Sequence, residues 1–237
     1  MKRLQEVAEL FAGQVQGKIA DKMFAGAEFD SGKVQQGQIF FALKGQKADG
    51  HDYLEAAKEN GAACAVVSEI RAVDIAQICV NDTREAFLAL AKVYRDSWQD
   101  KVVIGLTGSM GKTTTKEMTA VLCNQLGKTH ATPGNYNNVL GLSYTILNTP
   151  LDAHYVVVEM GISEVGEMEA LAGLAKPDFA LITNIAPCHL SGLGTIEKIA
   201  EEKSYIYQSL KRDGVAVINN RDARSAYFKN RTNIRNK

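Results

Sequence analysis

The sequence has no net charge, no long apolar run and no C-x-x-C cysteine pair, and each absence excludes a class of protein. Its 27 basic residues balance 27 acidic ones, so it is not a general polyanion binder and any anion site must be local. No apolar run approaches the roughly 20 residues that a membrane-spanning helix needs. The N-terminal MKRLQEVAEL alternates charged and apolar residues, unlike a secretory signal. Four scattered cysteines predict reduced, mostly buried thiols of a cytoplasmic protein: Cys64, Cys79, Cys123 and Cys188.

What remains is an ordinary globular composition, 46% hydrophobic and 23% charged, in a chain of 237 residues that is long enough for two small domains. We find no repeat and no low-complexity linker, and we predict two α/β units, residues 1–98 and 99–237. In the first, strands alternate with helices, which predicts a mixed or parallel sheet. The expected helices cover 4–11, 52–60 and 83–98, and the expected strands cover 37–43, 62–67 and 78–80.

The second unit repeats a β-α-β order with nearly continuous apolar strands, which predicts a doubly wound parallel sheet. After a first strand from 102, we expect strands over 155–158, 179–183 and 215–218, and helices over 142–147, 167–174 and 195–210. Residues 130–141 form a polar loop, and 221–237 a frayed tail. Ligands of such a sheet bind at the carboxyl ends of its strands, where Glu159, Asn184 and His189 lie.

The most informative stretch is VVIGLTGSMGKTTTKEM, residues 102–118. An apolar strand, a glycine loop and a helix N-terminus in this order are typical of a phosphate-binding loop. Lys112 can reach the β- and γ-phosphates of a nucleotide, and the Thr113 hydroxyl can ligate Mg²⁺. Since Leu106 occupies the usual position of the first glycine, the loop fits a narrower subclass. The alternative is a glycine-rich turn with an exposed lysine.

Several further stretches accompany this loop, and together they resemble the Mur ligases. They are GNYNNVLG from 134, VEMGISEVGEME from 158, TNIAPCHL from 183, IAEEKSYI from 199 and GQIFFALKGQKADGH from 37. The resemblance implies an N-terminal UDP-binding domain and a central ATPase domain. It covers the chain to about Asp222 and leaves the family's third domain unmatched, which predicts a fragment or a truncated product.

The resemblance also implies a reaction: ATP phosphorylates the carboxylate of a UDP-N-acetylmuramoyl-tripeptide, and the amine of D-Ala-D-Ala attacks the acyl phosphate. It implies a monomeric bacterial enzyme of the cytoplasm that needs Mg²⁺ and binds no nucleic acid. Two alternatives stay open. One is a sister ligase that adds a diamino acid or glutamate, and the other is a fragment that binds nucleotide without ligation.

Site residues in the second unit follow from the same resemblance. Lys112, Glu159, His189 and Lys203 are the expected catalytic residues, and Thr113, Glu159, His189 and Lys203 the expected metal ligands, with Lys203 carbamylated. Each has a plainer alternative: a solvated carboxylate for Glu159, a structural imidazole for His189 and a surface amine for Lys203. The expected nucleotide-binding residues are Gly108, Ser109, Met110, Gly111, Lys112, Thr113, Thr114, Asn135, Asn137, Asn138 and Asn184, although the asparagines could also serve a tight turn.

In the first unit, the resemblance assigns Ser31 to the UDP-sugar, together with a loop that contains Gly45, Asp49 and His51. Gly32 stands where the family usually has arginine, which puts the strength of UDP binding in doubt. Asp49 and His51 could equally cap their loop.

Overall fold

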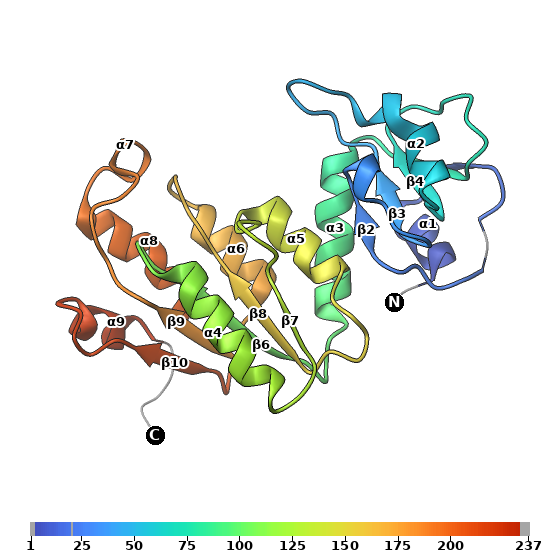
Figure 1. Ribbon diagram of the computed structural model, residues 1–237. Helices are drawn as coiled ribbons and strands as arrows, with labels where there is room; N and C mark the ends of the chain where they lie inside the picture. Colours follow the sequence, from blue (N-terminus) through green and yellow to red (C-terminus); the bar gives the residue numbers. More distant parts are fainter. Residues whose placement is uncertain (1–2, 20, 233–237) are drawn as a thin grey trace. The chain divides into compact units, whose positions relative to one another are not determined.

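The computed structural model describes residues 3–19 and 21–232, which divide into two compact units (Figure 1). The first contains residues 1–97 together with Ile146–Asn148, and the second contains Trp98–Thr145 and Thr149–Lys237. Three residues of the chain's middle thus group with the first unit, which a single boundary at 98 does not anticipate.

The first unit is built on a five-stranded mixed sheet in the order β1-β5-β4-β3-β2. The strands β2 (Ala27–Glu28), β3 (Ile39–Phe41), β4 (Cys64–Val67) and β5 (Gln77–Cys79) run parallel, while β1 (Gln14–Gln16) is antiparallel to β5. The sequence analysis did not predict β1 or β2. The three residues of β1 are all exposed, so they show no apolar alternation from which a strand could be inferred.

Helices α1 (Leu4–Phe11), α2 (Leu54–Glu59) and α3 (Thr83–Asp96) complete this unit, with short 3₁₀ turns η1 (Ser31–Lys33) and η2 (Gly50–Tyr53). The α3 helix starts at Thr83 because the Asp82 carboxylate accepts hydrogen bonds from the backbone N–H groups of Arg84 and Glu85. Its apolar face is buried, and the ring of Phe87 meets that of Phe41 edge-on at 5.0 Å between centroids. This packing fixes α3 against the carboxyl end of β3.

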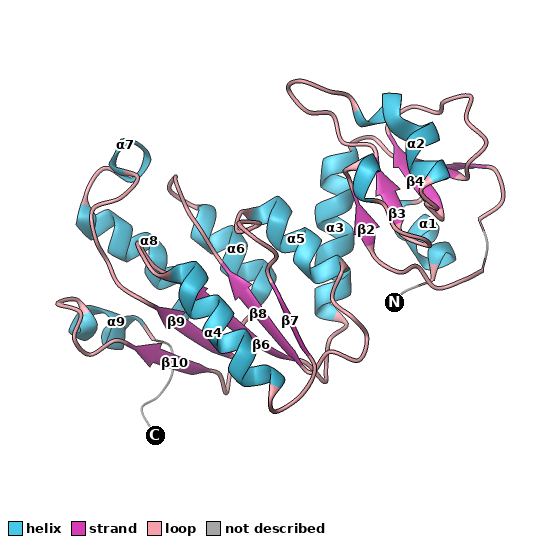
Figure 2. Cartoon of the chain, in the orientation of Figure 1, coloured by secondary structure: helices cyan, strands magenta, loops and turns pink. Residues whose placement is uncertain are grey.

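The second unit is a five-stranded, fully parallel sheet in the order β10-β9-β6-β8-β7. Its strands are β6 (Val102–Thr107), β7 (Thr129–Ala131), β8 (Tyr155–Glu159), β9 (Phe179–Ile182) and β10 (Val215–Ile218). Figure 2 shows α4 (Lys112–Asn124) in front of the strands and α6 (Glu167–Ala175) behind them. The predicted doubly wound sheet is confirmed. The remaining helices are α5 (Val139–Leu147), α7 (Leu190–Leu193), α8 (Ile196–Gln208) and α9 (Ser225–Arg231).

Two expectations for this unit are wrong. Residues 130–131 belong to the edge strand β7 rather than to a loop, because main-chain pairing with β8 holds a segment whose half-buried side chains carry little apolar signal. The expected frayed tail contains α9, because Phe228 is buried and packs against the ring of Tyr207 at 5.9 Å between centroids. Contacts of α9 with another helix, such as this ring contact and the ion pair of Arg231 with Glu201, leave no periodic trace in the sequence. Residues 233–237 of that tail lie outside the described residues.

Two further findings concern general expectations. Among the described residues, no helix combines the length and the apolar character that crossing a bilayer requires. All four cysteines are free: Cys64 and Cys123 are buried, and Cys79 and Cys188 are half-buried.

Candidate nucleotide and metal site

The glycine loop joins the carboxyl end of β6, the central strand of the second sheet, to the start of α4. Gly111 is the N-cap residue of α4 with φ at +77° and no side-chain cap, so the N–H groups of the helix's first turn remain for an external anion. The ammonium of Lys112 donates to the carbonyl oxygen of Gly108 at 2.9 Å. This folded-back lysine lies directly beside the loop in which we expect phosphate.

The loop is braced from the neighbouring strand end. The Asn184 side chain contacts both polar groups of the Met110 backbone: it accepts from the N–H at 3.1 Å and donates to the carbonyl at 3.0 Å. The Thr183 hydroxyl donates to the same carbonyl at 2.7 Å. Asn184 therefore shapes the loop as part of its wall, a role that a nucleotide-contact prediction does not anticipate.

Gly108 lies where this brace comes closest to the loop. Its φ is +152°, and a Cβ atom there would overlap the Thr183 hydroxyl oxygen. At Gly111, by contrast, a Cβ would meet nothing within 4 Å, so only its left-handed backbone favours glycine. Glycine is thus required at Gly108 mainly because Thr183 approaches it closely, and at Gly111 because its φ is positive.

Glu159, the last residue of β8, is only 1% exposed, so the solvated-carboxylate alternative is wrong. One carboxylate oxygen accepts from the Asn137 side-chain amide at 3.0 Å. The other oxygen is buried and has no hydrogen-bond partner among the described residues. A buried carboxylate oxygen without a donor is costly, and a hard cation is the group that it suits best.

Lys203 on α8 is 1% exposed, so it is not a surface lysine. Its ammonium nitrogen lies 3.5 Å from the hydroxyl of Thr107, the last residue of β6. Burial, and then the charge of Lys112, lower the pKa of Lys203 from 10.5 to about 8. A substantial fraction of this amine is therefore neutral near physiological pH.

For the other predicted residues of this unit, a role in nucleotide or metal binding stays a prediction. His189 is exposed, with φ at +49°, and precedes α7. Asn138 accepts from the Gly141 backbone N–H in the first turn of α5, as the tight-turn alternative expects, and Asn135 is exposed. Within residues 3–19 and 21–232, no three His, Cys, Asp or Glu side chains cluster as metal ligands. A metal here would depend on Glu159, hydroxyls and the substrate's own phosphates, a combination typical of Mg²⁺.

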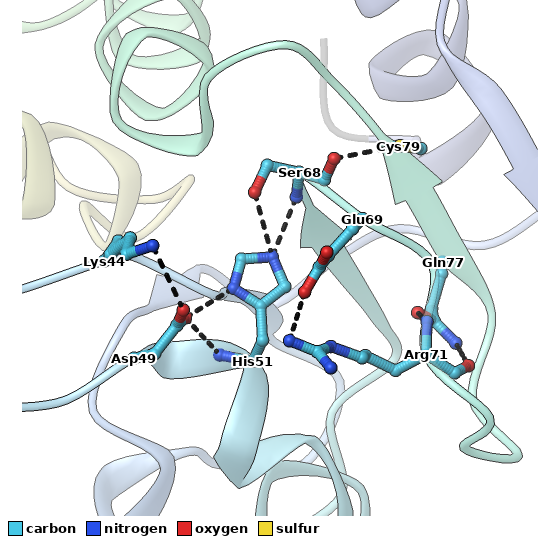
Figure 3. Close-up of polar contacts among 8 residues, drawn as sticks. All are labelled: Lys44, Asp49, His51, Ser68, Glu69, Arg71, Gln77 and Cys79. Atoms are coloured by element: carbon cyan, nitrogen blue, oxygen red, sulfur yellow. Dashed lines mark hydrogen bonds and ion pairs between the residues drawn. The ribbon is translucent and has the colours of Figure 1, made fainter.

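The residues predicted to bind the UDP-sugar lie at the carboxyl edge of the first sheet, in η1 after β2 and in the loop after β3. Figure 3 shows His51 between Asp49 and Ser68. The His51 Nδ1 atom lies 2.6 Å from the Asp49 carboxylate, and Nε2 accepts from the Ser68 backbone N–H at 2.9 Å. Nε2 is therefore unprotonated and Nδ1 carries the hydrogen. The hydrogen bonds from the His51 backbone and then its ring lower the pKa of the Asp49 carboxyl.

These contacts show Asp49 and His51 capping their own loop, the second of the two possibilities raised by the sequence. The Gly45 backbone N–H donates to the carbonyl of Ala48, within the same loop, at 2.9 Å. The backbone carbonyl of Ser31 accepts from the Asn60 side chain at 2.9 Å. A role in substrate binding stays a prediction for all four residues.

The sequence analysis missed several residues that shape the second-unit site. One is Cys188, whose sulfur lies 3.2 Å from the hydroxyl of Ser109, a predicted nucleotide-binding residue that itself exchanges hydrogen bonds with the Ala186 backbone at 2.9 Å. Thr183 and Cys188 were within reach of inference, because both directly flank residues that were predicted. Lys116 lies within the stretch 102–118 and Thr132 within the expected loop 130–141, but neither was given a role, because their contacts appear only in three dimensions.

Comparison with known proteins agrees with this geometry. The family model of the "Mur ligase middle domain" matches residues 106–237, and that of the "Mur ligase family, catalytic domain" matches residues 24–95. Similar curated relatives are UDP-N-acetylmuramoyl-tripeptide--D-alanyl-D-alanine ligases. The one from Escherichia coli is 38% identical over 91% of this chain and 47% of the relative, and the one from Bacillus subtilis is 39% identical over 90% and 48%. The chain spans about half the length of these relatives.

Solved structures agree as well. A crystal structure of MurF from Acinetobacter baumannii superposes with a TM-score of 0.85 at 32% identity, over 97% of this chain and 51% of that one. MurF ligase from Thermotoga maritima, solved in complex with ADP, gives a TM-score of 0.69 at 33% identity, over 81% of this chain and 44% of that one.

Proposed function

This chain belongs to the Mur ligase family, and we propose that it carries the nucleotide-binding and acid-activating part of an ATP-dependent ligase. The proposed reaction joins D-Ala-D-Ala to UDP-N-acetylmuramoyl-tripeptide, as the names of its relatives suggest. The observation that supports it most is the buried Glu159 carboxylate, of which only one oxygen accepts a hydrogen bond among the described residues. Glu159 is the last residue of β8 and lies opposite Leu106 of β6, the strand that leads into the glycine loop.

In this proposal the chain positions charges rather than forming bonds to the substrate. The substrate carboxylate attacks the γ-phosphorus of ATP, ADP leaves, and an acyl phosphate forms on the tripeptide. The amine of D-Ala-D-Ala then attacks the acyl carbon and inorganic phosphate departs. Lys112 and the first-turn N–H groups of α4 would bind phosphate oxygens, while Thr113 and Glu159 would hold Mg²⁺. The metal ion would neutralise charge on the transferring phosphoryl group.

We further propose that Lys203 reacts with CO₂. Its amine nitrogen forms a bond to the carbon and releases a proton, which leaves a carbamate in place of a buried ammonium. The lowered pKa supports this, because only the neutral amine is nucleophilic. Carbon-13 NMR of protein equilibrated with labelled bicarbonate should give one carbamate resonance that is absent from Lys203→Gln. An identical spectrum from this variant would refute the modification.

The test of the ligase is ADP release with UDP-N-acetylmuramoyl-tripeptide, with and without D-Ala-D-Ala. Turnover that needs both substrates is the expected result. Nucleotide binding without any turnover would reduce the function to nucleotide binding. Turnover with a diamino acid or glutamate in place of the dipeptide would instead indicate a sister ligase. A cytoplasmic location and a monomeric state are also proposed, and size-exclusion chromatography with light scattering tests the latter.

A further inference from the structure

One turn after Lys112, the α4 helix carries a second lysine whose side chain has no contact with solvent. Lys116 is 0% exposed, which is unusual for an ammonium group, because removing a charge from water is costly unless acceptors surround it. Its nitrogen donates to the carbonyl oxygens of Thr132 at 2.8 Å and Gly134 at 3.2 Å, and it pairs with the exposed Glu117 carboxylate at 2.8 Å. Three acceptors satisfy its three hydrogens.

Two of these acceptors belong to the segment 132–137 that follows β7. The segment has no regular structure in the described chain, and Gly134 takes a φ of +50°. Its start is held by one main-chain hydrogen bond beyond the end of β7, from the Thr132 N–H to the Val157 carbonyl at 3.0 Å, and otherwise by side-chain contacts. Lys116, on the helix α4, donates two of these side-chain hydrogen bonds, to the carbonyls of Thr132 and Gly134.

The same segment holds Glu159 in two ways. The Thr132 hydroxyl accepts a hydrogen bond from the Glu159 backbone N–H at 3.0 Å, and Thr132 is itself 1% exposed. The Asn137 side chain donates to the Glu159 carboxylate at 3.0 Å, and the Asn137 carbonyl accepts from the Gly161 N–H at 2.9 Å. The Glu159 backbone is therefore held by Thr132, which Lys116 contacts directly, and its carboxylate by Asn137, three residues after the Gly134 carbonyl that Lys116 also contacts.

We propose that Lys116 is a positioning residue that sets the spacing between the start of α4 and the carboxylate of Glu159. This inference rests on the proposed function, in which Thr113, three residues before Lys116, and Glu159 hold one Mg²⁺. That ion tolerates little departure from octahedral geometry, so the ends of two different elements must be held at a fixed separation. Lys116 links those elements through one buried ammonium and the segment 132–137.

The test is the gain in ATP affinity that Mg²⁺ provides, measured by calorimetry in excess EDTA and again in excess Mg²⁺. Lys116→Met keeps the length of the side chain and removes its donors. Thr132→Val removes the hydroxyl that accepts from Glu159. Since supporting residues around a metal typically contribute about ten- to a hundredfold to its binding, both variants should lose at least about tenfold of the Mg²⁺-dependent gain. Their metal-free ATP affinity should be unchanged, because the glycine loop is untouched.

Matched controls separate this role from general stability. Glu117→Gln keeps an oxygen that can accept from Lys116, and Thr132→Ser keeps the hydroxyl that accepts from the Glu159 N–H. Both variants should retain the full Mg²⁺-dependent gain in ATP affinity. Cys123→Ala, which removes a buried side chain from the same helix away from this segment, should lower the melting temperature without changing the gain. If Lys116→Met fails to fold, as judged by circular dichroism, Lys116→Gln takes its place.

The outcomes are distinct. A wild-type protein that binds no nucleotide would refute the proposed function and this inference with it. A wild-type protein with a Mg²⁺ gain that Lys116→Met, or Lys116→Gln in its place, fully retains would overturn only the role of Lys116. Equal loss of metal-free and Mg²⁺-dependent affinity would also overturn it, because that pattern describes a collapsed site.

Discussion

The Lys203 ammonium nitrogen and the Thr107 hydroxyl oxygen lie 3.5 Å apart, where α8 meets the carboxyl end of the central strand. The lysine is 1% exposed and no carboxylate is hydrogen-bonded to it among the described residues. The folded protein therefore carries a desolvated amine beside the phosphate loop. This relationship has a measurable consequence for stability.

Stability should rise with pH in the alkaline range because of Lys203. Its pKa is about 8 in the folded protein and 10.5 normally, so between these values the unfolded chain binds more protons and unfolding becomes harder as pH rises. Below about 8 the burial penalty is fully present. At about 1.4 kcal/mol per pKa unit, the total approaches roughly 3 kcal/mol. Urea unfolding between these pH values, in CO₂-free buffer with EDTA so that Lys203 stays a free amine, should show this rise in the wild type and a smaller one in Lys203→Met. Equal slopes for both proteins would contradict the prediction.

Lys112→Ala should weaken ATP binding strongly while the fold survives. The side chain's described hydrogen bond goes to the nearby Gly108 carbonyl, so its removal costs little structure. A charge-assisted hydrogen bond contributes about 1.5–3 kcal/mol, which corresponds to roughly ten- to a hundredfold in affinity. Calorimetric titration with ATP measures the loss, and circular dichroism checks the fold. Lys128→Ala, which removes an exposed lysine paired with Asp152, is the control and should bind ATP normally.

Gly108→Ala should disable the phosphate loop through a steric clash. The new methyl group would overlap the Thr183 hydroxyl, which braces the Met110 carbonyl. We expect at least a tenfold loss of ATP affinity, with the sheet intact by circular dichroism. Gly173→Ala is the matched control, because Gly173 is inside α6 with open space around its Cβ position. That change should raise stability by about 0.5–1 kcal/mol. Normal ATP binding by Gly108→Ala would show that the loop does not need this approach.

His51→Ala should loosen the loop after β3 in the first unit. It removes the acceptor of the Ser68 N–H and leaves the Asp49 carboxylate with the backbone N–H of residue 51 alone of its two hydrogen bonds from His51, and a polar group left unpaired away from water costs about 1–3 kcal/mol. Hydrogen exchange should increase over residues 44–51. If this loop borders the UDP-sugar, affinity for UDP-N-acetylmuramoyl-tripeptide should fall while ATP affinity stays constant. His51→Gln, which keeps a polar side chain, should recover part of the protection. Unchanged exchange in His51→Ala would refute the bracing role.

The sequence by itself determined the parallel sheet of the second unit and the position of its phosphate loop. Both depend on local features: apolar runs such as Val102–Ile104 in a fixed order, and glycines directly before a helix. The same local reasoning failed at β1, β7 and α9. Their stability comes from main-chain pairing or from one ring contact, such as that of Phe228 with Tyr207, and neither leaves a pattern in neighbouring residues.

Only the tertiary structure decided how the candidate site is supported. Glu159 and Lys203 were predicted from a resemblance, but their burial, the unpaired Glu159 oxygen and the anchoring role of Lys116 depend on elements far apart in the chain. Whether a charged side chain is solvated or enclosed is set by what packs around it. That environment arises from long-range contacts, which local composition and spacing do not encode.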